Sequence, residues 1–175
     1  MSTYVAVPER PLQVGDEAPN FDLTSTEDVL LMLRDEVPRT AVVLYFFASA
    51  GEARAVADLD ALSARRAALA ELDAKAMAIS PAPLAELKKL QAERRLEFPL
   101  LHDDRGFATA YGFEPAAPPA LYVVDRWQKI LWLQNPVASV AAALPEIEKL
   151  LGKTPPPTAL YPKKVINRWI ARWVS

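Results

Sequence analysis

The sequence predicts an α/β fold in which a central mixed β-sheet is flanked by helices. Four short apolar runs have the length and composition of buried strands, namely 41–48, 75–79, 120–124 and 129–133. The segments between them repeat their apolar residues with the period of amphipathic helices. A chain of 175 residues suits a single core, so we expect one domain over residues 1–152.

The first two strands and the helix between them form a βαβ unit. The strand at 41–48 is followed by a helical pattern over 52–72, whose apolar face carries Val56, Leu59, Leu62, Leu69 and Leu72. The strand at 75–79 comes next along the chain. Two strands joined in this way are parallel, with a right-handed crossover.

The remaining elements complete a sheet with helices on its faces. A second helix is predicted over 83–96. The last two strands are separated only by residues 125–128, so they form an antiparallel hairpin. A further helix at 137–151 closes the domain. This order of elements is that of a thioredoxin-type sheet with a short N-terminal extension.

Four segments resemble the peroxiredoxin family, also called the AhpC/TSA or thiol-specific antioxidant family, in order and spacing. They are VGDEAPNFDL at 14–23, ISP at 79–81, FPLLHD at 98–103, and YG at 111–112 followed by ALYVVD at 120–125. The resemblance extends from residue 14 to about residue 150. It implies a thioredoxin fold of the peroxiredoxin type and, for ordinary members, the reduction of peroxides by a cysteine thiol.

The departures from this family lie where its chemistry takes place, and the chain has no cysteine. Peroxiredoxins carry a proline, a Thr or Ser and the peroxide-attacking cysteine on the first turn of the helix after the first core strand. An ungapped alignment puts Ala48, Glu52 and Ala55 at these positions, and the family's arginine would fall at Pro119. Since all four groups are replaced, the pattern is not that of one engineered cysteine.

The same turn also resembles the active-site segment of thioredoxin-like thiol reductases. In that segment Phe-Phe-Ala-Ser precedes Trp-Cys-x-x-Cys, and residues 46–49 have the same four residues. In that alignment Gly51 and Arg54 stand at the two cysteines, and Pro119 stands at a cis proline. We therefore expect the Pro118–Pro119 bond to be cis. Under both alignments the chain resembles a cysteine-free, divergent redoxin without thiol chemistry. We expect no metal and no cofactor. The vestigial positions are Ala48, Ser49, Gly51, Glu52, Arg54, Ala55 and Pro119.

Oxygen and nitrogen groups offer two alternative sites. Glu52, Arg54 and Asp58 begin a helix whose exposed amides could hold an anion, although helix capping and a solvated charged face are the more common role. His102 beside Asp103 and Asp104 suggests a metal or proton-transfer site, but adjacent loop residues seldom converge on one ion, which favours a solvated turn. A non-thiol enzyme would use Ser49, Glu52, Arg54 and His102.

The C-terminal segment is a second candidate for function. Residues 153–162 contain three consecutive prolines and predict a stiff linker, and residues 163–175 predict a basic amphipathic helix. The apolar face of that helix carries Val165, Ile166, Trp169, Ile170, Trp173 and Val174. Such a face docks on its own domain, pairs with a second copy to give a homodimer, binds another protein, or contacts a membrane surface weakly.

Composition narrows the classes of function. Residues 153–175 hold five of the 20 basic residues and none of the 22 acidic ones, which leaves residues 1–152 with a net charge of −7. This argues against nucleic-acid binding. The first residues lack the pattern of a signal peptide, so we expect a cytoplasmic location. The sequence thus predicts a binding, structural or regulatory module, with an enzyme as the alternative, either a peroxide-reducing oxidoreductase of the family or a non-thiol enzyme.

Overall fold

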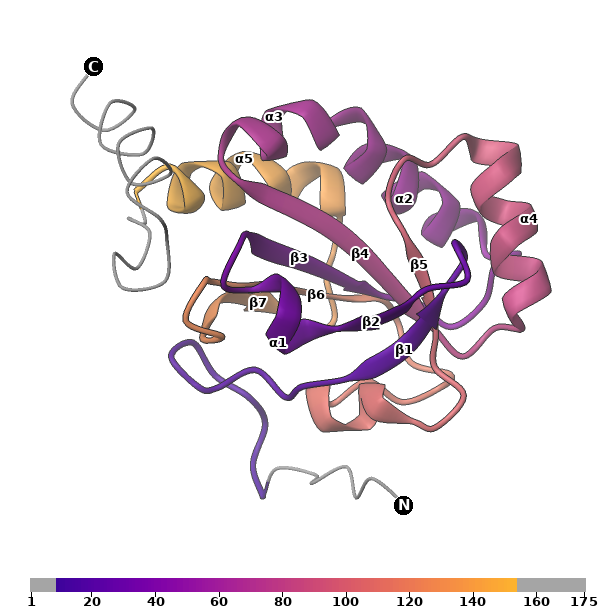
Figure 1. Ribbon diagram of the computed structural model, residues 1–175, viewed down its shortest axis with the longest axis horizontal. Helices are drawn as coiled ribbons and strands as arrows, with labels where there is room; N and C mark the ends of the chain where they lie inside the picture. Colours follow the sequence, from indigo (N-terminus) through magenta and orange to yellow (C-terminus); the bar gives the residue numbers. More distant parts are fainter. Residues whose placement is uncertain (1–8, 154–175) are drawn as a thin grey trace.

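The computed structural model describes residues 9–153, whose strands form one mixed seven-stranded sheet (Figure 1). The order of strands across the sheet is β2-β1-β5-β4-β3-β6-β7. β3 lies between β4 and β6, and all of its residues are buried. The strands are β1 (Asp22–Ser25), β2 (Leu30–Met32), β3 (Ala41–Phe46), β4 (Ala74–Ser80), β5 (Leu100–His102), β6 (Ala120–Val124) and β7 (Ile130–Gln134).

Helices cover both faces of the sheet. Figure 1 shows α2 to α5 along one face, and α1 and the 3-10 helix η1 belong to the opposite side. Each face therefore has its own buried apolar cluster. The helices are α1 (Leu33–Glu36), α2 (Ala53–Ala64), α3 (Arg66–Glu71), α4 (Leu84–Arg94), η1 (Phe107–Tyr111) and α5 (Val140–Leu151).

The predicted pairings of the four apolar strands are confirmed. β3 and β4 are parallel, with Phe46 opposite Ile79, as expected for a βαβ unit. β6 and β7 form the antiparallel hairpin. The segment predicted as a short N-terminal extension is a larger part of the sheet than expected, because β1 pairs with β5 and places Thr24 opposite His102.

The helical pattern over 52–72 contains a break. α2 ends at Ala64, and Arg65 leaves the helical region with φ −101° and ψ 7° before α3 begins. Its N–H donates to the Leu62 carbonyl at 3.2 Å, the tighter bonding that often ends a helix. Leu62 and Leu69 are both buried on either side of the break, so the apolar face continues through it. That continuity is why the pattern predicted one helix.

The expectation of a cis Pro118–Pro119 bond is wrong. Among residues 9–153 the cis peptide bond is Asn135–Pro136. Pro119 is buried and leads directly into β6, and its carbonyl accepts a 2.8 Å hydrogen bond from the Val137 N–H. Pro119 leads into β6 and accepts this hydrogen bond with a trans Pro118–Pro119 bond, which is the lower-energy isomer before proline.

The cluster on the η1 side of the sheet is built around Phe46. Its ring lies 5.0 Å from Tyr111, 5.8 Å from Phe113 and 5.7 Å from Tyr122, measured between ring centroids. Tilted and edge-on arrangements at these separations are the favourable ones for aromatic rings. These contacts fix η1 against the start of β6.

The predicted linker after Lys153 and the predicted C-terminal helix, with its apolar face from Val165 to Val174, lie outside the described residues. No helix within residues 9–153 is both long enough and apolar enough to cross a membrane.

Candidate functional site

The vestigial positions gather where the parallel strands end. β3, β4 and β5 finish at one edge of the sheet, with Phe46 opposite Ile79 and Ser80 opposite His102. On the other side of β3, Phe46 pairs with Ala120, so Pro119 comes alongside the turn that leaves β3. In open α/β sheets this edge is the usual place for ligands. Ala48 lies on the turn that follows β3, and Pro119 directly precedes β6, so this register places both at the same edge of the sheet.

The turn between β3 and α2 is held by hydrogen bonds to Ser49. The Ser49 hydroxyl accepts a 3.3 Å hydrogen bond from the Gly51 N–H, and the Ser49 carbonyl accepts one from the Glu52 N–H, also at 3.3 Å. Ser49 and Gly51 are exposed. Within the described part of the chain, no histidine or acidic side chain bonds to the Ser49 hydroxyl. A serine without a base is a weak nucleophile.

Ser80 ties this turn to β4. Its hydroxyl lies 3.4 Å from the Ala48 carbonyl, to which it donates, and it accepts from the Ala82 N–H at 3.1 Å. Ser80 is buried. In the sequence, Ser80 is part of the ISP segment at 79–81 that resembles the family.

Ala55 lies inside the protein. Its exposed fraction is 0%, and it belongs to the cluster between the sheet and helices α2 to α5. The peroxiredoxin alignment assigns the attacking cysteine to this position. A nucleophile has to be accessible to its substrate, and the methyl group of Ala55 instead packs in the core.

Glu52 occupies the N-cap position of α2 without capping it through its side chain. Its φ of −76° and ψ of 119° are those of an extended residue, and its carbonyl accepts the Val56 N–H at 3.1 Å. The expected side-chain capping is therefore wrong for Glu52. Among residues 9–153, the Glu52 carboxylate forms no hydrogen bond and no ion pair.

Asp58 is buried and belongs to a hydrogen-bonded network. The prediction that it lies on a solvated charged face is therefore wrong. Its carboxylate accepts a 2.6 Å hydrogen bond from the Tyr45 hydroxyl and a 3.3 Å hydrogen bond from the Val140 N–H. The Arg54 Nε lies 3.6 Å from the same carboxylate, and the Arg54 guanidinium also donates to the Val137 carbonyl. Burial, reinforced by the hydrogen bond to Asp58, raises the pKa of Tyr45 well above its usual range.

This network joins β3, α2 and the first residue of α5. Val140 begins α5, and its N–H is one of the donors that a helix start leaves without an intrahelical acceptor. Arg54 and Asp58 are four residues apart on α2, and Tyr45 lies on β3. The contacts of these three side chains therefore connect β3 and α2 to the start of α5.

His102, Asp103 and Asp104 point to different partners. The His102 Nδ1 lies 2.8 Å from the Ala82 carbonyl, and Asp104 is exposed, 3.7 Å from the Arg105 Nε. Asp103 is buried and not in a solvated turn, because its two oxygens accept the N–H groups of Phe107 and Ala108 at 2.9 Å each. Among residues 9–153, no three His, Asp or Glu side chains are grouped so that they could hold a metal ion.

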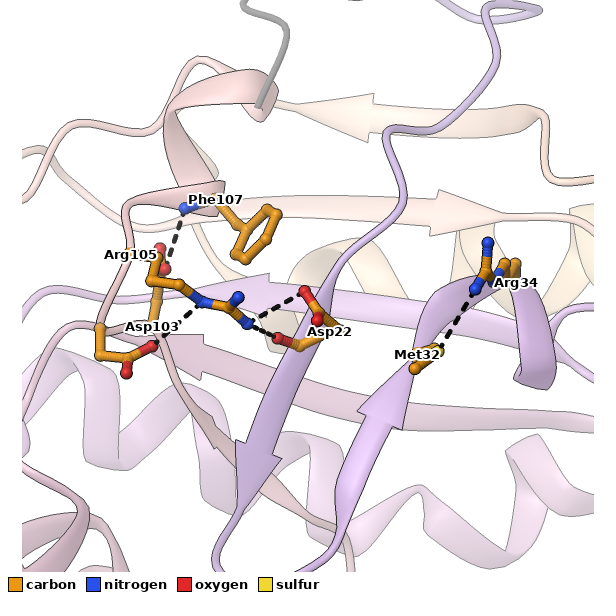
Figure 2. A network of polar contacts seen from close by, with 7 residues as sticks. Asp22, Met32, Arg34, Asp103, Arg105 and Phe107 are labelled. Carbon is orange, nitrogen blue, oxygen red and sulfur yellow. Dashed lines mark hydrogen bonds and ion pairs between the residues drawn. The ribbon is translucent and has the colours of Figure 1, made fainter. Parts of the chain in front are cut away.

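A network that no sequence pattern predicted anchors η1 to β1. Figure 2 shows Arg105 between Asp22 and Phe107. Its guanidinium lies 4.9 Å from the centre of the Phe107 ring, 3.0 Å from an Asp22 carboxylate oxygen, and also donates to the Asp22 carbonyl. Together with Asp103, this cation–π and ion-pair contact fixes the start of η1.

Comparison with known proteins agrees with this architecture. The AhpC/TSA family model matches residues 14–133. No curated protein is a significant match to the chain. Among solved structures, peroxidoxin BcpB from Mycobacterium tuberculosis is similar with a TM-score of 0.74 and 22% identity, over 80% of this chain and 96% of that one.

Two further peroxiredoxin structures are similar in fold. PrxQ from Xylella fastidiosa, solved as a cysteine-to-serine mutant, has a TM-score of 0.72 and 16% identity over 81% of this chain and 96% of its own. AhpC from Mycobacterium tuberculosis has a TM-score of 0.68 and 22% identity over 81% and 92%. The family match covers more than half of the chain and the fold is that of these proteins, so the chain belongs to the AhpC/TSA family as a cysteine-free member.

Proposed function

We propose that this chain is a non-catalytic member of its family that acts as a binding, structural or regulatory module. The observation that carries the proposal is Ala55, which stands where the family has its attacking cysteine and is fully buried. The chain has no cysteine elsewhere that could take over the role. Thiol peroxidase and disulfide-reductase chemistry both need a thiolate.

The polar groups around the turn support the same proposal. Arg54 and Asp58 form an ion pair, Arg54 also donates to the Val137 carbonyl, and Asp58 accepts the Val140 N–H at the start of α5. Both side chains are therefore already engaged within the protein. The Ser49 hydroxyl belongs to its own turn, and His102 bonds to the Ala82 carbonyl. A non-thiol enzyme would have to release these groups from their present partners.

Peroxide consumption by the purified full chain tests the loss of catalysis. We expect no consumption of hydrogen peroxide above the buffer rate, with either dithiothreitol or a thioredoxin system as the reductant. Consumption that disappears in Glu52→Gln or Arg54→Lys would overturn the proposal and establish the enzyme. Glu86→Gln, an exposed change on α4, is the matched control.

We propose that the C-terminal segment supplies the contact surface of this module, with homodimer formation or a protein partner ahead of a membrane surface. The support is the apolar face predicted for residues 163–175, which water alone would not accommodate. Light scattering of the full chain beside a version that ends at Gly152 tests this. We expect a dimer for the full chain and a monomer for the shortened one. Equal masses would exclude self-association through the segment.

A further inference from the structure

A cavity of about 570 Å³ lies away from the β3–α2 turn, between the N-terminal arm, defined as residues 9–12, and the end of η1. Its floor comes from η1, β6 and β7, and includes Tyr111, Tyr122 and Leu133. The volume is within the range of small-molecule sites, which is about 300–1,000 Å³.

The arm that forms one wall is fixed by an ion pair. The Arg10 guanidinium donates to both oxygens of Asp16, at 2.8 Å and 2.9 Å, and Asp16 also accepts the Gln13 N–H at 2.8 Å. Leu12 packs against the cluster on the η1 side of the sheet. The positive charge of Arg10 is therefore neutralised at the wall of the cavity.

The hydrogen-bond donors that line the cavity already have acceptors. The Tyr122 hydroxyl donates to the Tyr111 carbonyl, and the Thr109 hydroxyl donates to the Gly106 carbonyl at 2.7 Å. The Asn135 side-chain N–H group donates to the Gly112 carbonyl at 3.2 Å. A ligand therefore finds few free donors in this cavity.

Acceptors remain. Within residues 9–153, the Asn135 side-chain oxygen and the carboxylates of Glu9 and Glu114 have neither a hydrogen-bond partner nor an ion pair. Both glutamates line the cavity and are exposed. With Arg10 paired to Asp16, the lining has an uncompensated charge from two carboxylates, next to an apolar floor.

We propose that this cavity binds a small organic cation, in particular a primary ammonium group on an apolar body. An ammonium group has three donors and no acceptor, which complements a lining of free acceptors. Its apolar body would lie on Leu133, Leu12 and Ala110. Anionic ligands are disfavoured by the same two carboxylates.

Amide NMR of the ¹⁵N-labelled full chain at pH 7 tests this with 2-phenylethylamine as the probe and 2-phenylethanol as its uncharged analogue. We expect the amine to shift the Asn135 side-chain amide and the Gly112 N–H saturably, and to bind more tightly than the alcohol. Equal binding of amine and alcohol, or shifts confined to other parts of the chain, would overturn the proposal.

Glu114→Gln separates recognition of charge from binding of the apolar body alone. We expect this substitution to weaken binding of the amine by about two- to fivefold, which is the effect of one exposed ion pair. The affinity for the alcohol should not change. Glu86→Gln on α4 removes another exposed carboxylate, one that does not line the cavity, and should change the affinity for neither compound. The same affinity for the amine in Glu114→Gln and in the unmodified chain would contradict the proposed role of the carboxylate.

Discussion

The Tyr45 hydroxyl donates a 2.6 Å hydrogen bond to the Asp58 carboxylate, and both residues are buried. This contact joins β3 to α2, the helix that follows the vestigial turn. Because Asp58 also accepts the Val140 N–H, the loss of Tyr45 as a donor would leave a buried carboxylate under-bonded.

Tyr45→Phe should therefore lower the free energy of unfolding by about 1.5–3 kcal/mol, the range for hydrogen bonds to charged groups. Tyr111→Phe is the matched control, because the Tyr111 hydroxyl donates to the neutral Pro19 carbonyl. It should cost about 0.5–1.5 kcal/mol. Urea denaturation of both variants measures the difference, and a smaller loss for Tyr45→Phe than for Tyr111→Phe would contradict this interpretation.

Restoring a thiol at the family position should not restore chemistry. In Ala55→Cys the new thiol would be buried, which raises its pKa and limits its access to reagents. We expect it to react with an aromatic disulfide reagent about 100-fold more slowly than Gly51→Cys, because a local opening of about 3 kcal/mol must come first. Gly51 is exposed, and an added Cβ would meet only the Ser49 hydroxyl, at 3.9 Å. Equal rates would show that position 55 is accessible.

Alanine substitutions of Asp103 and of its neighbour Asp104 should have very different effects on the free energy of unfolding. Asp103→Ala removes the acceptor of two backbone N–H groups at the start of η1 and should lower the free energy of unfolding by about 2–4 kcal/mol. Asp104→Ala removes an exposed side chain and should change it by less than about 0.5 kcal/mol. Similar losses in urea denaturation would mean that Asp103 does not fix η1.

Stability should fall at alkaline pH. Burial raises the pKa of Tyr111 well above its usual value, and burial also raises the pKa of Tyr122. A raised folded pKa gives stability that is complete below the unfolded value of about 10 and is lost as the pH rises above it. The free energy of unfolding should thus decline above about pH 10. Tyr111→Phe should make that decline shallower, and an unchanged slope would show that Tyr111 titrates normally.

The long elements of the fold were predictable because their apolar patterns are local. β6 was predicted with its observed bounds, and β3, β4, β7 and α4 to within one or two residues at each end. β1, β2 and α1 were not predicted, since each has only three or four residues and β1 depends on pairing with β5 far along the chain. No local pattern records such a pairing.

The sequence could predict which residues lie around the β3–α2 turn, but not their hydrogen bonds. The alignments placed Ala48, Ala55 and Pro119 near one turn, and the structure does so too. They did not reveal that Asp58 is buried, because its partner Tyr45 is on another element. Asp103 and Asp104 are likewise neighbours of the same residue type. They differ only in the folded protein, where Asp103 accepts hydrogen bonds from the start of η1 and Asp104 is exposed.

The strand order also determines how the chain must be assembled during its synthesis. β3 emerges early, yet its neighbour β6 ends at Val124 and pairs with Val42 only once that part of the chain is complete. In the same way, β1 can pair with β5 only after β5 has been synthesised. Pairings between distant segments form slowly, and unpaired apolar strands tend to associate with other chains. A nascent chain stopped before residue 120 would therefore leave one side of β3, a strand whose residues are all buried in the folded protein, open to such association.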